Sequence, residues 1–220
     1  MTIGITVTGA DIRTDVADLL ALAQTPGVET GLLFSLSPEG RNRYPDEGWL
    51  AEAATELGLS CAVHICGWKA RQAALNGECD WIQRAGRVQI NGRIDLDQLE
   101  RATELFRCVI TQYPGAGDVL AHPARNHSIL VDASGGTGVE PNQWKRPDTD
   151  KPVGFAGGLS PQNFDEHLPG IASVAIGRWW IDMESCLRYG WTVHKSDWFD
   201  MHQVWLAVER FTAWKAREGL

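Results

Sequence analysis

The stretch His127-Ser-Ile-Leu-Val-Asp-Ala-Ser-Gly-Gly-Thr-Gly138 decides the fold, together with the shorter stretch Val153-Gly-Phe-Ala-Gly-Gly-Leu159. Each begins as a run of β-branched or apolar residues and ends in small residues, which is typical of a buried strand followed by a tight turn. Because glycine permits close approach of the backbone and exposes N–H groups, both turns are suited to binding an anion such as phosphate. The two units indicate neighbouring parallel strands of an α/β barrel, with a site where the strands end.

Strand-like and helix-like segments alternate along the whole chain. Predicted strands cover residues 3–8, 31–35, 60–65, 88–90, 108–112, 128–131 and 153–156, and an eighth begins at 173–176. Predicted helices cover residues 11–23, 47–57, 69–76, 95–106, 161–167 and 196–215, and a short, proline-interrupted one lies within 115–126. This pattern predicts a single (β/α)8 TIM barrel over residues 1–220, with a degenerate fifth helix. The alternative, an open doubly wound sheet, finds no support, because no Gly-x-Gly-x-x-Gly motif follows the first strand.

Net charge and hydropathy restrict the class of partner. The formal net charge of −8 argues against general binding of nucleic acid or of anionic membrane surfaces. A small phosphorylated substrate stays compatible with that charge, because a local set of N–H groups and an Arg can bind it. No stretch reaches the roughly 18 apolar residues that a membrane-spanning helix needs, so we expect no membrane partner.

Cysteine usage points to a reducing, cytoplasmic location. The chain has five cysteines, an odd number, and they form no Cys-x-x-Cys pair. This pattern predicts neither a disulfide framework nor a zinc site. The first ten residues carry no basic segment followed by an apolar run, so we expect no signal peptide.

From Ser128 to Leu159 the sequence resembles phosphoribosylanthranilate isomerase, a small single-domain barrel of tryptophan biosynthesis. Leu130-Val-Asp-Ala-Ser-Gly-Gly-Thr-Gly138 is similar to the family's sixth strand, where an Asp precedes a Gly-Gly-Thr-Gly turn. Pro152-Val-Gly-Phe-Ala-Gly-Gly-Leu159 is similar to the family's seventh strand, Leu-Ala-Gly-Gly-Leu. Weaker similarities in the first half are Gly31-Leu-Leu-Phe34 and Val88-Gln-Ile-Asn-Gly92.

The resemblance implies an Amadori rearrangement of an N-ribosyl aminosugar phosphate. That reaction needs an acid to protonate the ring oxygen and a base to remove the C2 proton. The resemblance implies that Asp132 is the acid, whereas an acid that caps the turn is the alternative. The implied phosphate- and substrate-binding residues are Gly135, Gly136, Thr137, Gly138, Gly157, Gly158, Asp182 and Ser185. No metal and no organic cofactor are implied, and a homodimer is left open.

The general base is where the chain departs from the family. The family closes its first strand with Lys-Ile-Cys-Gly and uses that Cys as the base, whereas this chain has Thr8 in its place. Cys66, at the end of the third predicted strand, is a candidate to supply the thiolate from another strand. An inert buried thiol is the alternative for Cys66. His64 and Cys66 together are too few ligands to predict a metal site.

Two further departures concern substrate binding. After the eighth strand, Glu184 and Cys186 stand where the family's Asp-Val-Ser-Ser-Gly-Val-Glu segment has a Ser and a Gly. Glu184 brings a negative charge to the expected phosphate site, which Arg178 or Arg188 is a candidate to offset. Glu39 stands where the family has its anthranilate-binding Arg, and Arg41 or Arg43 in the same loop is a candidate to substitute for it.

The sequence therefore supports two principal hypotheses. The first is an isomerase-like enzyme that acts on a phosphorylated sugar or related small anion, with Asp132 as proton donor. The second is a barrel that has lost catalysis and either binds a small phosphorylated ligand or serves as a regulatory or interaction module. Thr8, Glu39 and Glu184 favour the second, because three functional positions have changed together. Another barrel activity, such as an aldolase or epimerase, is a lesser third.

Overall fold

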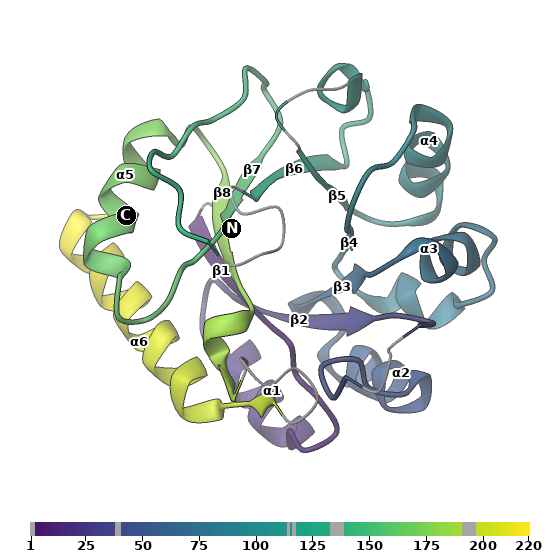
Figure 1. The fold of residues 1–220 in the computed structure, drawn as a ribbon, viewed down its shortest axis with the longest axis horizontal. Coiled ribbons are helices and arrows are strands. Elements are labelled where there is room, and N and C mark those ends of the chain that lie inside the picture. The colour runs from purple at the N-terminus through teal and green to yellow at the C-terminus, as the bar shows by residue number, and fades with distance from the viewer. Residues whose placement is uncertain (1–2, 38–40, 114, 116–117, 133–138, 191–196) are drawn as a thin grey trace.

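The structure is a computed structural model, and it describes residues 3–37, 41–113, 115, 118–132, 139–190 and 197–220. Eight parallel strands form a closed barrel in sequence order, and the last pairs with the first (Figure 1). They are β1 (Ile3–Thr8), β2 (Val28–Phe34), β3 (Cys61–Ile65), β4 (Arg87–Ile90), β5 (Val109–Gln112), β6 (His127–Asp132), β7 (Val153–Ala156) and β8 (Trp179–Met183). The predicted (β/α)8 barrel is confirmed.

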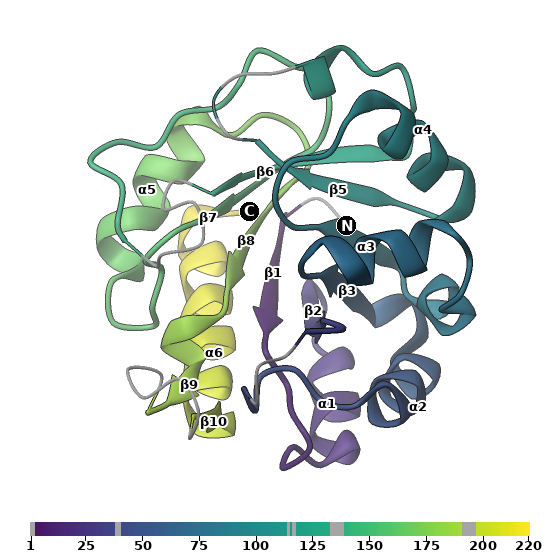
Figure 2. The same ribbon diagram turned by 45° about the vertical axis from the view of Figure 1, so that its right-hand side comes forward.

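Helices cover the outside of the barrel (Figure 2). They are α1 (Val16–Ala23), α2 (Glu47–Leu57), α3 (Trp68–Leu75), α4 (Leu96–Leu105), α5 (Phe164–Val174) and α6 (Met201–Glu218). Four of them begin after an Asp whose carboxylate accepts a backbone N–H of the first turn, namely Asp15, Asp46, Asp95 and Asp200. Such a cap satisfies an N–H that the helix itself leaves without a partner. None of the helices in the described parts of the chain is long and apolar enough to span a membrane.

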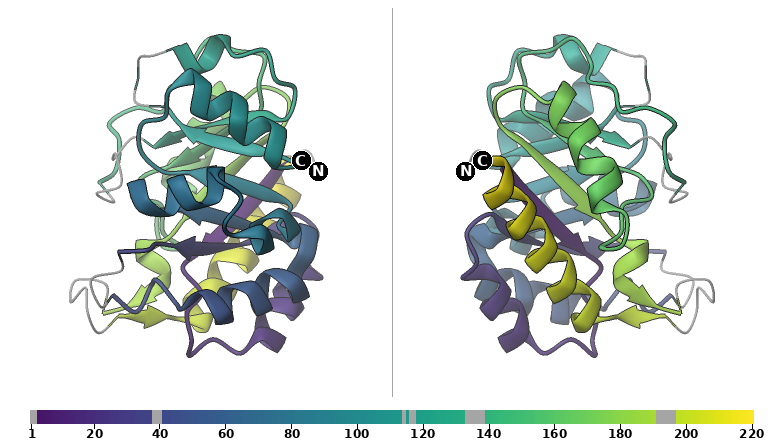
Figure 3. Two further views of the ribbon diagram at one scale, coloured as in Figure 1. Left: turned by 90° about the vertical axis from the view of Figure 1, so that its right-hand side faces the viewer. Right: turned by 90° about the vertical axis from the view of Figure 1, so that its left-hand side faces the viewer.

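Short elements complete the chain. The 3-10 turns are η1 (Gly58–Ser60), η2 (Asp80–Arg84), η3 (Asp118–Ala121) and η4 (Ser185–Leu187). The turn η3 stands between β5 and β6, where the sequence predicted a degenerate fifth helix. Among residues 139–152 no helix forms before β7. A two-stranded antiparallel ribbon of β9 (Arg188–Tyr189) and β10 (Trp198–Phe199) precedes α6. Figure 3 shows the end of α6 beside the start of β1.

Three predicted elements near the C-terminus are wrong in position. Residues 173–174 belong to the last turn of α5, and the eighth strand begins at Trp179. The helix predicted at 161–167 runs on to Val174 through Pro169. Burial of Leu168 and Ile171 against the core outweighs the hydrogen bond that a proline removes. The helix predicted at 196–215 begins at Met201, because Trp198 and Phe199 pair with β9 instead.

The interior of the barrel is divided by a thin apolar layer. Ile110, Leu130 and Trp180 pack together there, with Ala156 beside them, as a cluster separate from the main core between strands and helices. We call these three side chains the interior plug. Gly154 makes room for it, since a Cβ at that position would lie 2.2 Å from Cε2 of Trp180. Polar side chains lie on both sides of the plug, so the barrel carries a polar region at each end.

Candidate active site

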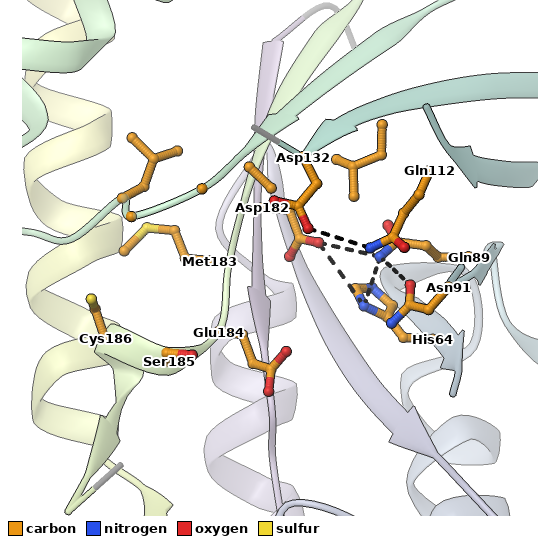
Figure 4. Close-up of a pocket in the computed structure, with 15 residues that line it drawn as sticks. His64, Gln89, Asn91, Gln112, Asp132, Asp182, Met183, Glu184, Ser185 and Cys186 are labelled. Atoms are coloured by element: carbon orange, nitrogen blue, oxygen red, sulfur yellow. Dashed lines mark hydrogen bonds and ion pairs between the residues drawn. The ribbon is translucent and has the colours of Figure 1, made fainter. Parts of the chain in front are cut away.

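A cavity of about 110 Å³ lies at the carboxyl ends of the strands, the end where TIM barrels carry their active sites (Figure 4). Polar side chains from several strands converge there, and the interior plug closes its floor. Its lining comprises His64, Gln89, Asn91, Gln112, Leu130, Asp132, Ala156, Gly157, Gly158, Leu159, Asp182, Met183, Glu184, Ser185 and Cys186. The sequence-predicted residues Asp132, Gly157, Gly158, Asp182 and Ser185 are therefore brought to one place.

Asp182 is held by side chains from three other strands. Thr8 Oγ1 donates a hydrogen bond to its Oδ1 over 2.7 Å, and both residues are buried. Gln89 Nε2 lies 3.5 Å from Oδ2, and Nδ1 of His64 lies 3.9 Å from the same oxygen. Gln89 also donates to the Asn91 amide oxygen over 3.0 Å, which fixes the orientation of its own amide. The carboxylate of Asp182 is thus oriented before any ligand arrives.

Asp132 faces the same cavity from the end of β6. In the strand register Asp132 pairs with Ala156, and Ala156 pairs with Asp182. The two carboxylates therefore stand at one level of the barrel, separated by the small side chain of β7. Gln112 Nε2 lies 3.5 Å from Oδ2 of Asp132, while its Oε1 accepts the Gly92 N–H over 2.7 Å. That second bond turns the amide NH2 toward Asp132.

Thr8 and Cys66 are the two candidates for the general base, and neither presents a thiolate at the site. Thr8 already donates its hydroxyl proton to Asp182, so it serves that carboxylate as a partner. Cys66 accepts a hydrogen bond from Asn91 Nδ2 over 3.3 Å. Burial, with a contribution from the charge of Glu184, raises the pKa of the Cys66 thiol to about 12. Cys66 is therefore a thiol near neutral pH, which favours its alternative reading as an inert group.

The turn after β7 contributes backbone to the cavity. Gly157 and Gly158 have φ angles of +123° and +65°, which favour glycine. A Cβ at Gly158 would lie 2.7 Å from the backbone nitrogen of Glu140, so the close approach of this segment also requires glycine. The Glu140 carboxylate above it accepts a hydrogen bond from Asn163 over 2.9 Å and lies 3.4 Å from Nε2 of His167. Gly135, Gly136, Thr137 and Gly138 lie outside the described residues, so their part in a phosphate site stays a prediction.

Glu184 forms an ion pair on one side of the cavity. Arg43, from the loop after β2, reaches Glu184 Oε1 over 2.6 Å through Nη1. Figure 4 shows the Glu184 carboxyl directed away from Ser185 and Cys186. Burial raises the pKa of Glu184, and the Arg43 charge opposes that rise. The negative charge of Glu184 is thus balanced by Arg43 at the side of the cavity away from Ser185 and Cys186.

A buried ion network extends from this pair. Arg43 Nη2 donates to Asp197 Oδ2 over 2.7 Å, and Arg188 Nε donates to the same oxygen over 2.8 Å. Arg188 also donates to Asp11 over 2.7 Å and to the carbonyl of Gly9. Because all three nitrogens of the Arg188 guanidinium are engaged in this way, Arg188 does not offset the charge of Glu184 at a phosphate site, contrary to the prediction.

The remaining arginine candidates lie elsewhere. Arg41 is half-buried in the same loop as Arg43, and neither arginine is part of the cavity lining. Within the described residues, Arg43 contacts the site only through its ion pair with Glu184. Arg178 precedes β8 and lines a cavity at the opposite end of the barrel. The described lining of the candidate site holds the carboxylates of Asp132, Asp182 and Glu184, and no Lys or Arg. Over the described residues, no group of three or more His, Cys, Asp or Glu side chains is placed to hold a metal ion.

Sequence reasoning missed the groups that join distant parts of the chain. Gln89, Asn91 and Gln112 are visible in the sequence as polar strand ends, and they do line the cavity. Asp11 and Asp197 carry no such signal, because each lies in a connecting segment and finds its partner, Arg188, only through the fold.

Known structures share this fold over nearly the whole chain. Phosphoribosylanthranilate isomerase from Thermus thermophilus superposes with a TM-score of 0.67 at 17% identity, covering 96% of this chain and 98% of that one. Monomers generated from the dimeric isomerase of Thermotoga maritima give 0.66 at 15% identity, covering 94% and 97%. TrpF from Jonesia denitrificans gives 0.66 at 16% identity, covering 94% and 96%.

At the level of sequence alone, no protein-family model matches the chain, and a search of curated proteins found no match. The likeness therefore rests on the course of the backbone and on the motifs that end β6 and β7. The chain has the fold of the phosphoribosylanthranilate isomerases.

Proposed function

We propose that this barrel is an acid/base isomerase for a small phosphorylated sugar derivative, of the Amadori type that its motifs imply. The observation that carries the proposal is the register Asp132–Ala156–Asp182, which aims two carboxylates into one cavity from the ends of β6 and β8. An Amadori rearrangement needs two proton-transferring groups within reach of one substrate. The resemblance would place such an activity in tryptophan biosynthesis.

In this proposal Asp132 donates the proton to the ring oxygen, as the family motif implies. Asp182 removes the C2 proton in place of the family's Cys. Its carboxylate receives the hydroxyl of Thr8 and faces Gln89, and both contacts hold the oxygens in a fixed direction. Fixed orientation favours proton transfer, because less reorganisation is needed in the transition state.

The phosphate group would bind to backbone N–H groups of the turn after β7 and of the segment that begins at Ser185. Both line the cavity, and the Glu184 carboxylate, which also lines it, is neutralised by its ion pair with Arg43. Backbone N–H groups bind anions without a cationic side chain when several point at one place. This arrangement suits the described lining, which has no Lys or Arg.

A second candidate function is a barrel that binds a small phosphorylated ligand without turning it over. It is favoured by Thr8, whose hydroxyl is engaged with Asp182, and by the raised pKa of Cys66. Neither residue supplies the thiolate that the family uses.

Phosphoribosylanthranilate is fluorescent and loses its fluorescence on isomerisation, which separates the two functions. The isomerase proposal expects the wild-type protein to abolish the signal and Asp132→Asn to lose that ability. Asp148→Asn, the same change at an exposed position, is the matched control and should match the wild type. A wild-type protein that leaves the fluorescence intact, yet melts at a higher temperature with inorganic phosphate, supports the binder instead.

A further inference from the structure

A second cavity, of about 300 Å³, opens at the amino ends of the strands. It lies on the other side of the interior plug from the candidate active site, and Trp180 of the plug forms part of its wall. Residues at this end of a TIM barrel ordinarily serve stability. Here they leave a hollow larger than the candidate active site at the opposite end.

Positive charge gathers around this cavity, although the chain as a whole is acidic. Its lining contains three arginines, Arg87, Arg107 and Arg178, against one carboxylate, Glu29. One arginine is neutralised by that carboxylate, which leaves an excess of positive charge. A concave, positively charged surface with low-dielectric walls concentrates anions.

Arg87 is fixed at the inner wall of the cavity. Its Nε donates to Glu29 Oε1 over 2.8 Å, and its Nη2 donates to Glu29 and to Thr6 Oγ1, the latter over 3.0 Å. Its guanidinium lies 4.3 Å from the ring centroid of Trp180. These contacts use Nε and Nη2, and Nη1 makes no hydrogen bond with a described residue. One N–H pair of a rigid arginine therefore remains for a ligand.

Arg107 and Arg178 stand at the mouth of the cavity. Both are exposed, and they come from the segments that lead into β5 and β8. Neither makes a hydrogen bond or an ion pair with a described residue, so the fold gives them no partner there. Guanidinium groups bind carboxylates through two parallel N–H···O bonds, which suits such a pair to capturing one.

The rest of the lining is apolar and partly aromatic. Ile5, Leu59, Pro152, Trp179 and Trp180 contribute to it. Inorganic anions gain nothing from such walls, whereas a flat apolar ring buries surface against them. We propose that this cavity binds a small aromatic carboxylate, its ring against this apolar wall and its carboxylate held by Arg107 and Arg178, with Nη1 of Arg87 within the same site.

Isothermal titration calorimetry with benzoate as the probe tests this proposal on the intact chain. The wild type should bind benzoate, and the double variant Arg107→Gln/Arg178→Gln should bind it at least about tenfold more weakly, as expected for the loss of charge-assisted hydrogen bonds. Arg101→Gln, a matched change on the exposed face of α4, should leave the affinity unchanged. Because Arg101, Arg107 and Arg178 are all exposed, these variants should melt at the wild-type temperature.

Two results would overturn the proposal. One is benzoate binding that is absent in the wild type or equal in the double variant. The other is inorganic phosphate that binds as tightly as benzoate and is weakened equally by Arg107→Gln/Arg178→Gln, which would place the phosphate in this cavity and show that its apolar wall plays no part. Neither result bears on the reaction proposed for the opposite end of the barrel, so the two proposals fail separately.

Discussion

Thr8 and Asp182 are hydrogen bonded across the line where the barrel closes. The Thr8 hydroxyl donates to Asp182 Oδ1 over 2.7 Å, and β1 and β8, which carry the two residues, are the first and last strands. In this chain the position that the family gives to a catalytic Cys therefore orients a neighbouring carboxylate.

Replacing Thr8 by Val keeps the shape of the side chain and removes that donor. Because a buried carboxylate then lacks its nearest hydrogen bond, we expect the free energy of unfolding to fall by about 1–3 kcal/mol. Thr30→Val is the matched control, since the Thr30 hydroxyl is equally buried and has no partner among the described residues. Urea unfolding of both variants measures the difference, and equal losses would contradict the assigned role of Thr8.

The buried ion pairs of Arg43 should contribute more to the free energy of unfolding than ion pairs at the surface. Arg43→Met removes the ion pair with the buried carboxylate of Asp197, over 2.7 Å, and the ion pair with Glu184, over 2.6 Å. We expect a loss of stability on the order of 3 kcal/mol. Arg217→Met breaks an exposed pair with Asp165 and should leave the thermal midpoint unchanged. A similar midpoint for the two variants would show that the buried network is dispensable.

The cysteines should react slowly with iodoacetamide in the native protein. Burial raises the pKa of every one, to about 12 for Cys61, Cys66 and Cys79, and upward for Cys108 and Cys186. Alkylation requires the thiolate, so labelling at pH 7.5 should be far slower than after unfolding in urea. Mass spectrometry locates the label. Rapid, selective modification of Cys66 would restore it as a candidate base.

His127 should make the fold sensitive to mild acid. Burial, with smaller contributions from Lys151 and His122, lowers its pKa from 6.5 to about 3. Between pH 6.5 and about pH 3, His127 is protonated in the unfolded chain and neutral in the folded chain. The free energy of unfolding therefore falls as the pH drops toward 3. The slope from this group approaches about 1.4 kcal/mol per pH unit.

Unfolding by urea at pH 7, 6, 5 and 4 measures that slope. His127→Gln should flatten it relative to the wild type, whereas His202→Gln, at an exposed position of α6, should not. Parallel pH curves for the wild type and His127→Gln would refute the assignment.

Most of the barrel is predictable because a parallel strand is buried on both faces and reads as an apolar run between turn residues. The eighth strand was misplaced because Val174 and Ile176 form such a run, although the packing of Leu168 and Ile171 extends α5 through the first of them. The degenerate fifth helix was predictable, because the segment between the fifth and sixth strands is too short for a full helix and contains prolines.

In the candidate site, residues that end strands were predictable and long-range pairs were not. Asp132 and Asp182 follow from strand position, because the carboxyl ends of parallel strands share one edge. The pairing of Arg43 with Glu184 and Asp197 joins residues 141 and 154 positions apart, and no local pattern encodes it. For the same reason the cavity around Arg87 appears only once the barrel is closed.

The central claim is that Asp132 and Asp182 transfer protons to and from one substrate. Proton NMR of phosphoribosylanthranilate in D2O tests it most directly, because removal of the C2 proton followed by ketose formation places solvent deuterium at C1. We expect the wild type and Asp148→Asn to form the deuterated ketose, and Asp132→Asn and Asp182→Asn to form it at least about 100-fold more slowly. A wild type that forms no ketose, or an Asp182→Asn variant as fast as the wild type, would contradict the account.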